Sequence, residues 1–209
     1  MTSTDDLIHS LASTAGARRS ASLQAAFAVA GAASLACALF LVFSVIGIRH
    51  DFADMAVRMP FGFKLAYTGS LVIGTFVVAL YVATPAASAT ALCALLPTII
   101  LLALGVLFDP TGFPIMGRTS TAVVFCVGSI LFLSLPAMIL MFRAMQKGAP
   151  TRPLVAGAVI GVLSASIGAI AYALACKNDG TAFVAIWYTA ACAIMALIGA
   201  VVGHRVLRW

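Results

Sequence analysis

Six long apolar segments, separated by short polar ones, make up most of this chain. A helix needs about 20 residues to cross the hydrocarbon core of a bilayer, and each segment is close to that length. The alternation of polar and apolar residues that a membrane β-barrel requires is missing, so helices are the expected spanning element. The segments cover residues 22–48, 64–84, 88–108, 119–142, 153–176 and 182–204. The pattern predicts an all-α, polytopic membrane protein with a six-helix transmembrane bundle.

Composition supports a membrane protein. Hydrophobic residues make up 63% of the 209 residues, charged residues only 9%, and the mean hydropathy is +1.14. A soluble domain has no need of so apolar a composition. The chain begins with polar and acidic residues instead of a basic region that leads into a short apolar one, so we expect no cleavable signal peptide.

The distribution of lysine and arginine predicts the orientation of the spans. With six spans, seven basic residues lie on the side of the N-terminus and five on the other side. The first group is Arg18, Arg19, Arg143, Lys147, Arg152, Arg205 and Arg208, and the second is Arg49, Arg58, Lys64, Arg118 and Lys177. This bias predicts that both termini are cytoplasmic. The net charge of +6 then reflects a basic fringe that faces anionic lipid, and no direct binding of nucleic acid is expected.

Short connections between the spans leave no room for a soluble domain with an active site. The longest polar segments are the N-terminal twenty residues and the loop 49–63. We expect residues 1–20 to form a cytoplasmic segment and residues 21–209 to form the transmembrane domain. Of the segments predicted to be cytoplasmic, only the N-terminal one is large enough to bind a protein partner by itself.

The residues that most membrane enzymes and ion-coupled transporters need are missing from the apolar segments. Every acidic and basic residue is predicted at a helix end or in a loop, and glutamate does not occur. The three histidines, His9, His50 and His204, cannot form the intramembrane pair that holds a b-type haem. No catalytic triad, phosphate loop or His-rich zinc motif can be assembled. We therefore expect no enzymatic activity.

Glycine and proline positions predict how some of the helices pack. Gly157 and Gly161, like Gly199 and Gly203, are four residues apart, a spacing that lets helix backbones approach closely within one subunit. Pro136 falls inside the fourth apolar segment, where a missing N–H group and a ring clash predict a kink. It is a candidate hinge, and a bend of fixed geometry is the alternative.

The five cysteines divide into two groups. Cys37, Cys93 and Cys192 lie inside apolar segments, where free cysteine behaves as a small hydrophobic residue. Cys126 and Cys176 are instead predicted near the water interface on one face of the membrane. They could form a disulfide in an oxidising compartment or bind a soft metal ion such as Cu(I), Zn²⁺ or Cd²⁺. A difference in depth of about 10 Å argues against a disulfide, so these residues alone leave a sensor and an inert pair equally open.

Several segments of the chain resemble the NrsF-type membrane anti-sigma factors of proteobacteria. The resemblance is strongest at the two ends of the chain and weakest between about residues 12 and 110. The segments that carry it are Thr4-Asp5-Asp6-Leu7-Ile8-His9-Ser10-Leu11, Cys126 through Leu131-Phe132-Leu133-Ser134-Leu135-Pro136, Lys147-Gly148-Ala149-Pro150-Thr151-Arg152-Pro153, Tyr172-Ala173-Leu174-Ala175-Cys176, Phe183-Val184-Ala185-Ile186-Trp187-Tyr188 and Gly203-His204-Arg205-Val206-Leu207-Arg208-Trp209.

The resemblance implies a regulator in the bacterial inner membrane that holds an extracytoplasmic-function sigma factor inactive. It also implies two functionally important cysteines, and Cys126 and Cys176 occupy the matching positions. The implied signals are heavy metals, with copper as a candidate, or oxidative stress. No cofactor is obligatory, and copper or another soft metal ion would bind at the two thiols as a signal.

We expect the N-terminal segment to be the sigma-binding part. Residues 4–20 would form a short amphipathic helix, N-capped by Thr4 or Asp5. Leu7, Ile8 and Leu11 would share the face that docks into a groove of the sigma factor, and Asp5 and Asp6 would meet its basic residues. A frayed tail is the alternative for this segment.

A signal at the thiols would change the packing of the fourth and fifth helices and reach the cytoplasmic side through Pro136 and the loop 143–152. Two rival functions remain at this point: a small metal or solute transporter or efflux subunit, and a purely structural partner of another membrane protein.

Overall fold

The computed structural model describes residues 4–51, 54, 58–84, 89–109, 111–119 and 121–207. Over residues 4–21 it describes the backbone and, of the side chains, only that of Asp6.

Helices form the whole of the regular structure in this described part. The elements are α1 (Thr4–Leu41), the π-helical turn η1 (Val42–Ile46), α3 (Met59–Val82), the 3₁₀ segment η2 (Ala89–Leu95), α4 (Leu96–Leu107), α5 (Ala122–Met145), α6 (Pro153–Tyr172) and α7 (Thr181–Val206). Six stretches are long and apolar enough to cross a membrane: Ser22–Ile46, Met59–Val82, Thr90–Leu107, Ala122–Met145, Pro153–Tyr172 and Thr181–Val206. The prediction of an all-α bundle with six such helices is confirmed.

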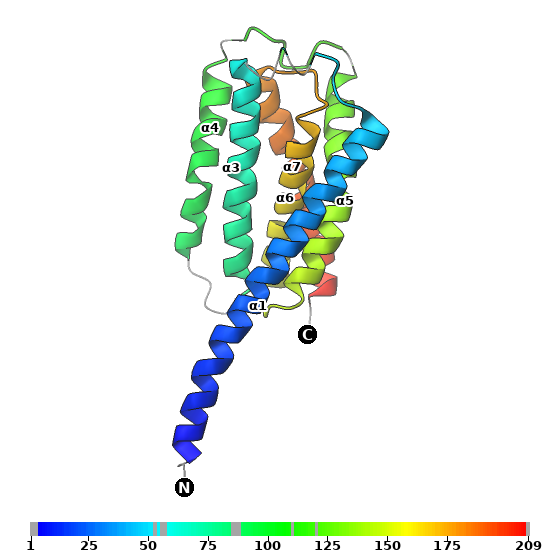
Figure 1. Ribbon diagram of the computed structural model, residues 1–209. Helices are drawn as coiled ribbons and strands as arrows, with labels where there is room; N and C mark the ends of the chain where they lie inside the picture. The colour runs from blue at the N-terminus through cyan, green and yellow to red at the C-terminus, as the bar shows by residue number, and fades with distance from the viewer. Residues whose placement is uncertain are drawn as a thin grey trace.

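The helices are arranged around α6. Two thirds of its apolar window is buried, 67%, against 17% for the span of α1 and 17% for that of α4. In Figure 1, α3 and α4 flank one side of the bundle, α5 the other, and α1 crosses the front obliquely. The N- and C-terminal ends of the chain lie toward the same end of the bundle (Figure 1), as an even number of spans requires.

Glycines on α6 and α7 allow these two helices to touch backbone to backbone. A Cβ atom on Gly157 would lie 2.2 Å from the carbonyl oxygen of Gly199, and one on Gly161 would lie 2.0 Å from that of Met195. Distances this short exclude any side chain larger than hydrogen. The prediction that the two glycine pairs pack helices inside one subunit is confirmed, and α6 and α7 form the rigid centre of the bundle.

Pro136 lies inside an unbroken α5. Two residues earlier, the Ser134 hydroxyl donates a hydrogen bond to the Ile130 carbonyl oxygen at 2.5 Å. A Cβ on Gly168 of α6 would lie 2.7 Å from the Ser134 Oγ atom, so α5 and α6 are in close contact beside the proline. Such tight packing favours a bend of fixed geometry, and the hinge at Pro136 stays a prediction.

The backbone of the N-terminal segment is helical over the predicted residues 4–20, and the helix continues beyond them into the first span. The backbone runs as one α-helix from Thr4 to Leu41, so the N-terminal segment and the first span are a single element. Its first part extends beyond the bundle at the end where the termini lie (Figure 1). Asp6 is exposed, whereas the side chains of Asp5, Leu7, Ile8 and Leu11 lie outside the described part. One continuous helix therefore links the predicted sigma-binding residues to the first span.

Candidate functional site

Cys126 and Cys176 meet at the end of the bundle opposite to the termini. Helix α5 begins at Ala122, so Cys126 lies about one turn inside it. Helix α6 ends at Tyr172, and a further turn, in which the Cys176 N–H donates to the Tyr172 carbonyl oxygen at 2.9 Å, carries the chain to Cys176. The two thiols lie beside each other, and both are free. The difference in depth that argued against their contact is therefore absent.

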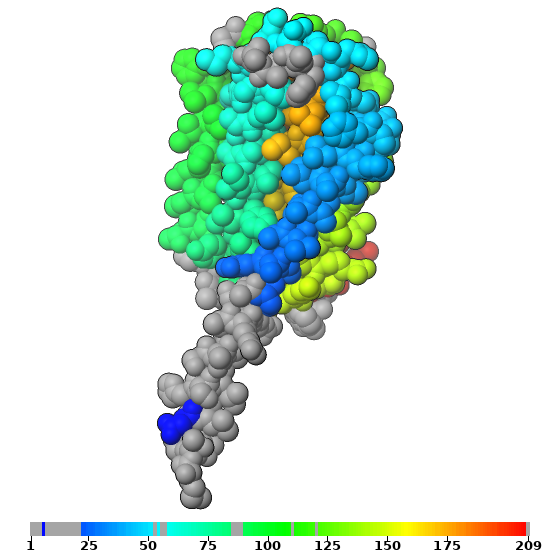
Figure 2. All heavy atoms as spheres, in the orientation of Figure 1, coloured from blue at the N-terminus to red at the C-terminus, as the bar shows by residue number. Residues whose placement is uncertain are grey.

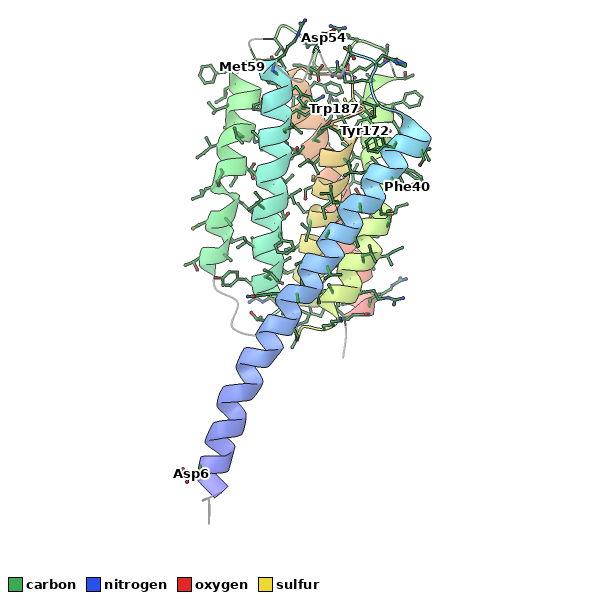
Figure 3. All side chains as sticks on the ribbon, in the orientation of Figure 1. Asp6, Phe40, Asp54, Met59, Tyr172 and Trp187 are labelled. Atoms are coloured by element: carbon green, nitrogen blue, oxygen red, sulfur yellow. The ribbon has the colours of Figure 1, made fainter. Side chains whose placement is uncertain are left out.

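Neither thiol lies at the wet boundary that the sequence predicted. Cys126 is fully buried and Cys176 is 2% exposed. The Tyr188 hydroxyl lies beside the Cys176 thiol and has no hydrogen-bond partner within the described residues. Tyr172 borders the same pair, and Figure 3 shows it toward the end of the bundle that is far from Asp6.

A buried ion cluster holds the loop that carries Cys176. The Asp179 carboxylate accepts hydrogen bonds from Arg49 at 2.8 and 3.0 Å and from the Lys64 Nζ atom at 2.7 Å. Both cations also donate to the Cys176 carbonyl oxygen, each at 3.2 Å. Lys64 is fully buried, Asp179 is 1% exposed and Arg49 5% exposed. Arg49 also pairs with the half-exposed Asp51 at 2.8 Å, which lowers the pKa of that carboxyl to about 2.

The electrostatic surroundings favour ionisation of Cys176. Contact with the Cys126 side chain lowers the pKa of the Cys176 thiol, and the nearby Lys64 cation lowers it further, although burial opposes both effects. A thiolate is the form of cysteine that attacks oxidants and binds metals. The Lys64 cation therefore lies where it can stabilise a thiolate at this pair.

Sequence reasoning missed this ion cluster. We placed Lys64 at a helix end, but α3 begins at Met59, so Lys64 lies more than a turn inside the helix and is fully buried. The expectation that every charged residue lies at a helix end or in a loop is thus wrong for Lys64. Asp179 appeared to be an ordinary loop residue. One signal was available: Asp179, Arg49 and Lys64 were all assigned to the same side of the membrane, close to Cys176.

Loop residues 108–119 cover the α6–α7 loop. Three hydrogen bonds hold them in place: from the Ala182 N–H to Asp109 at 3.3 Å, from the Trp187 Nε1–H to the Ile115 carbonyl at 2.8 Å, and from the Arg118 N–H to Asn178 at 3.3 Å. A cavity of ≈ 310 Å³ remains at this rim. It is lined by Arg49, Asp51, Asp54, Arg58, Pro60, Phe113, Arg118, Lys177 and Asp179. Arg49 and Asp179 of the ion cluster form part of its wall.

The donor set at the thiols suits some metal ions better than others. Within the described residues, no group of three or more His, Cys, Asp or Glu side chains could hold a metal ion. Zn²⁺ in structural sites is usually held by four protein ligands, whereas soft thiolates by themselves suit Cu(I). Two thiols without a third such ligand in the described part of the chain therefore do not form the kind of site that structural Zn²⁺ occupies.

Comparison with known proteins gives a consistent family. Residues 11–209 match the family model described as NrsF, negative regulator of sigma F. The chain is 30% identical to a probable anti-sigma-F factor NrsF of Azospira oryzae, over 99% of both chains. It is also 38% identical to the anti-sigma-F factor NrsF of Caulobacter vibrioides, over 40% of this chain and 39% of that one. No solved structure matches the chain.

The two acidic partners of Arg49 offer a test of the ion cluster. We expect Asp179→Asn to destabilise the protein by about 3–5 kcal/mol, because it leaves Lys64 and Arg49 buried without their shared countercharge. Asp51→Asn makes the same chemical change at a half-exposed position and should alter stability little. Thermal unfolding of the two variants in the same detergent measures the difference. Equal melting temperatures for both variants would show that the Asp179 cluster does not hold the loop.

Proposed function

Because this chain belongs to the NrsF family, the negative regulators of sigma F, we propose that it is a non-enzymatic membrane anti-sigma factor that binds a sigma factor and holds it inactive. The match over residues 11–209 is the observation that carries the proposal. In its finer form, the partner is a sigma factor of the extracytoplasmic-function class, and the protein lies in the bacterial inner membrane with both termini cytoplasmic. The bias of basic residues toward the side of the termini supports this orientation.

The proposed sigma-binding element is the part of α1 that precedes the first span. Residues 4–21 extend for about 27 Å at the helical rise of 1.5 Å per residue. On a helix, Leu7, Ile8 and Leu11 share one face, the arrangement with which an amphipathic helix docks into an apolar groove. Asp5 and Asp6 would lie near the tip and pair with basic residues of the sigma factor.

We propose that the contact between Cys126 and Cys176 is the sensor. Oxidation would join the two thiols as a disulfide, with two electrons and two protons passing to the oxidant. Alternatively, Cu(I) or another soft metal ion would bind the two thiolates and release their protons. Either event replaces a non-covalent contact of the two thiols by a stronger link between α5 and the α6–α7 loop. Such a signal shifts the equilibrium only if it favours one packing over the other, and a change in the position of Cys176 supplies that difference.

The contacts favour a route from the thiols to the N-terminal segment that we did not expect. Arg49 donates to the Cys176 carbonyl oxygen, and it follows directly on η1, the turn that ends the first span at Ile46. Between them Gly47 has a φ of +83°, a conformation that glycine adopts without strain. A displacement of the Cys176 backbone would therefore move Arg49. Through Arg49 it would act on the end of the first span, which is continuous with the helix that carries Leu7 and Leu11. It is an alternative to the route through Pro136 and the loop 143–152.

Substitution of single cysteines tests the sensor. We expect Cys126→Ala or Cys176→Ala to abolish the response of a sigma-dependent reporter to copper, cadmium and a thiol oxidant. Cys192→Ala and Cys37→Ala are matched controls, because these cysteines lie outside the contacting pair and should leave induction intact. A response to copper without one to the oxidant would identify metal binding, and the reverse would identify the disulfide. Full induction in both the Cys126 and the Cys176 variant would refute the sensor.

A pair of surface variants tests the docking face on α1. Leu7→Ser combined with Leu11→Ser should abolish pull-down of the co-expressed sigma factor, because it removes two apolar side chains from one helical face. His9→Ala combined with Ser13→Ala changes the opposite face and should retain binding. Membrane fractionation checks that both proteins still insert. Retention of the sigma factor by the Leu7 and Leu11 variant would exclude this face as the binding site.

The role of Arg49 can be separated from the thiol chemistry. We expect Arg49→Gln to leave oxidation of the cysteine pair intact, measured by mass spectrometry, while the reporter no longer responds to it. Lys64 still pairs with Asp179 in this variant, so the loop keeps one of its two cations. Arg58→Gln, an exposed neighbour in the same loop, should respond normally. Normal induction in Arg49→Gln would show that the signal takes another path.

A further inference from the structure

A groove lies between α1 and α5 at the end of the bundle where the termini lie. Its volume is ≈ 500 Å³. It is lined by Ser22, Ala25, Ala26, Val29, Ala30, Ala33, Leu140, Arg143, Ala144 and Lys147. Figure 2 shows the face on which α1 lies obliquely against α5. The groove exists because α1 crosses α5 at an angle and presents mainly alanine to it, so that the two helices do not fill the space between them.

The chemistry of the groove differs along its length. Arg143 stands in the last turn of α5 and Lys147 just beyond it, and both are exposed. Neither forms an ion pair within the described part of the chain, and none of the described lining residues is acidic. Deeper in, the walls are methyl groups and short aliphatic side chains. The site thus combines a cationic mouth with an apolar trough.

The dimensions of the groove correspond to one leaflet of a bilayer. Ser22 is the first residue of the first span, and Ala33 lies eleven residues further along α1. At the helical rise of 1.5 Å per residue, these two positions are about 16 Å apart, close to half of a hydrocarbon core of 30 Å. The cationic mouth therefore lies at the membrane interface, and the trough ends near the midplane.

We propose that this groove binds one anionic phospholipid from the leaflet on the side of the termini. The phosphate lies between Arg143 and Lys147, and an acyl chain follows the trough along Ala25, Val29 and Ala33. A zwitterionic lipid would bring a cation of its own to a mouth that already holds two. Lipid is the occupant because the groove belongs to the spans and Val29 is 69% exposed on the outer surface of the bundle.

A lipid in this position would cover part of the α1 surface that the other helices leave exposed. The apolar window of the first span is only 17% buried, so a bound acyl chain adds contacts that neighbouring helices do not supply. Binding at Arg143 and Lys147 does not depend on the proposed sensor or on the sigma factor. The lipid site can therefore be tested separately from the proposed sensor and from sigma-factor binding.

Native mass spectrometry of the full chain tests the lipid site. The protein is purified in detergent and exposed to equal amounts of phosphatidylglycerol and phosphatidylcholine that have identical acyl chains. We expect retention of one phosphatidylglycerol in preference to phosphatidylcholine. Arg143→Gln combined with Lys147→Gln should reduce this preference by roughly 5- to 30-fold, since each basic residue near an anionic headgroup strengthens binding by about five-fold.

Matched variants make the result decisive. Arg152→Gln combined with Arg205→Gln removes two exposed cations at the same end of the bundle, outside the groove, and should keep the preference. Ala25→Leu combined with Ala33→Leu fills the trough from exposed positions and should reduce retention of both lipids. Equal retention of the two lipids by the parent protein would overturn the proposal. An equal loss of preference in the Arg143 and Lys147 variant and in the Arg152 and Arg205 variant would also overturn it. Full lipid retention by the Ala25 and Ala33 variant would do the same.

Discussion

The Asp179 carboxylate, buried between Lys64 and Arg49, is the interaction on which the rest of this structure depends. Burying three charges is costly, and it is tolerated only because each charge meets its partner at hydrogen-bond distance. The cluster joins α3, the chain that follows the first span and the α6–α7 loop. Through the Cys176 carbonyl oxygen it also holds the backbone of one of the two contacting cysteines. The Asp179 carboxylate thereby holds the Cys176 loop in place and links it to α3 and to the end of the first span.

The bundle divides into a tightly packed part and a loosely packed part. Helices α6 and α7 touch backbone to backbone through glycine, and α6 packs against α5 beside Ser134. Helix α1 is different, because grooves of ≈ 500 and ≈ 260 Å³ lie along it, the second against α3 and α6. Displacing α1 therefore breaks fewer close contacts than displacing α6 or α7. The switch that we propose would therefore move the first span against the more tightly packed α6 and α7.

The proposed sensor site is buried and lies next to a cation. Burial shields Cys126 and Cys176 from solvent, while the nearby Lys64 cation favours a thiolate. The polar rim cavity is lined by Arg49 and Asp179, the residues that hold the Cys176 loop. In the sensor that we propose, small ions and small oxidants would reach the pair in preference to larger molecules.

The sequence by itself determined the number of spans, the glycine contact between α6 and α7 and the placement of Cys126 and Cys176 on one face, because hydropathy and residue spacing are local properties of a helix. Only the tertiary structure decided that both thiols are buried, since the turn after Tyr172 is set by contacts of Cys176 with Arg49 and Lys64, which lie 127 and 112 residues away. The burial of Lys64 was also decided by the tertiary structure. The sequence predicts an interfacial residue, but Lys64 lies in the core because it pairs with Asp179, which is 115 residues away. The continuity of α1 was also hidden, because a polar helix and an apolar one differ in composition even where the backbone joins them without a break. Pairing between distant charges leaves no periodic trace in a sequence, and here it is this pairing that builds the site.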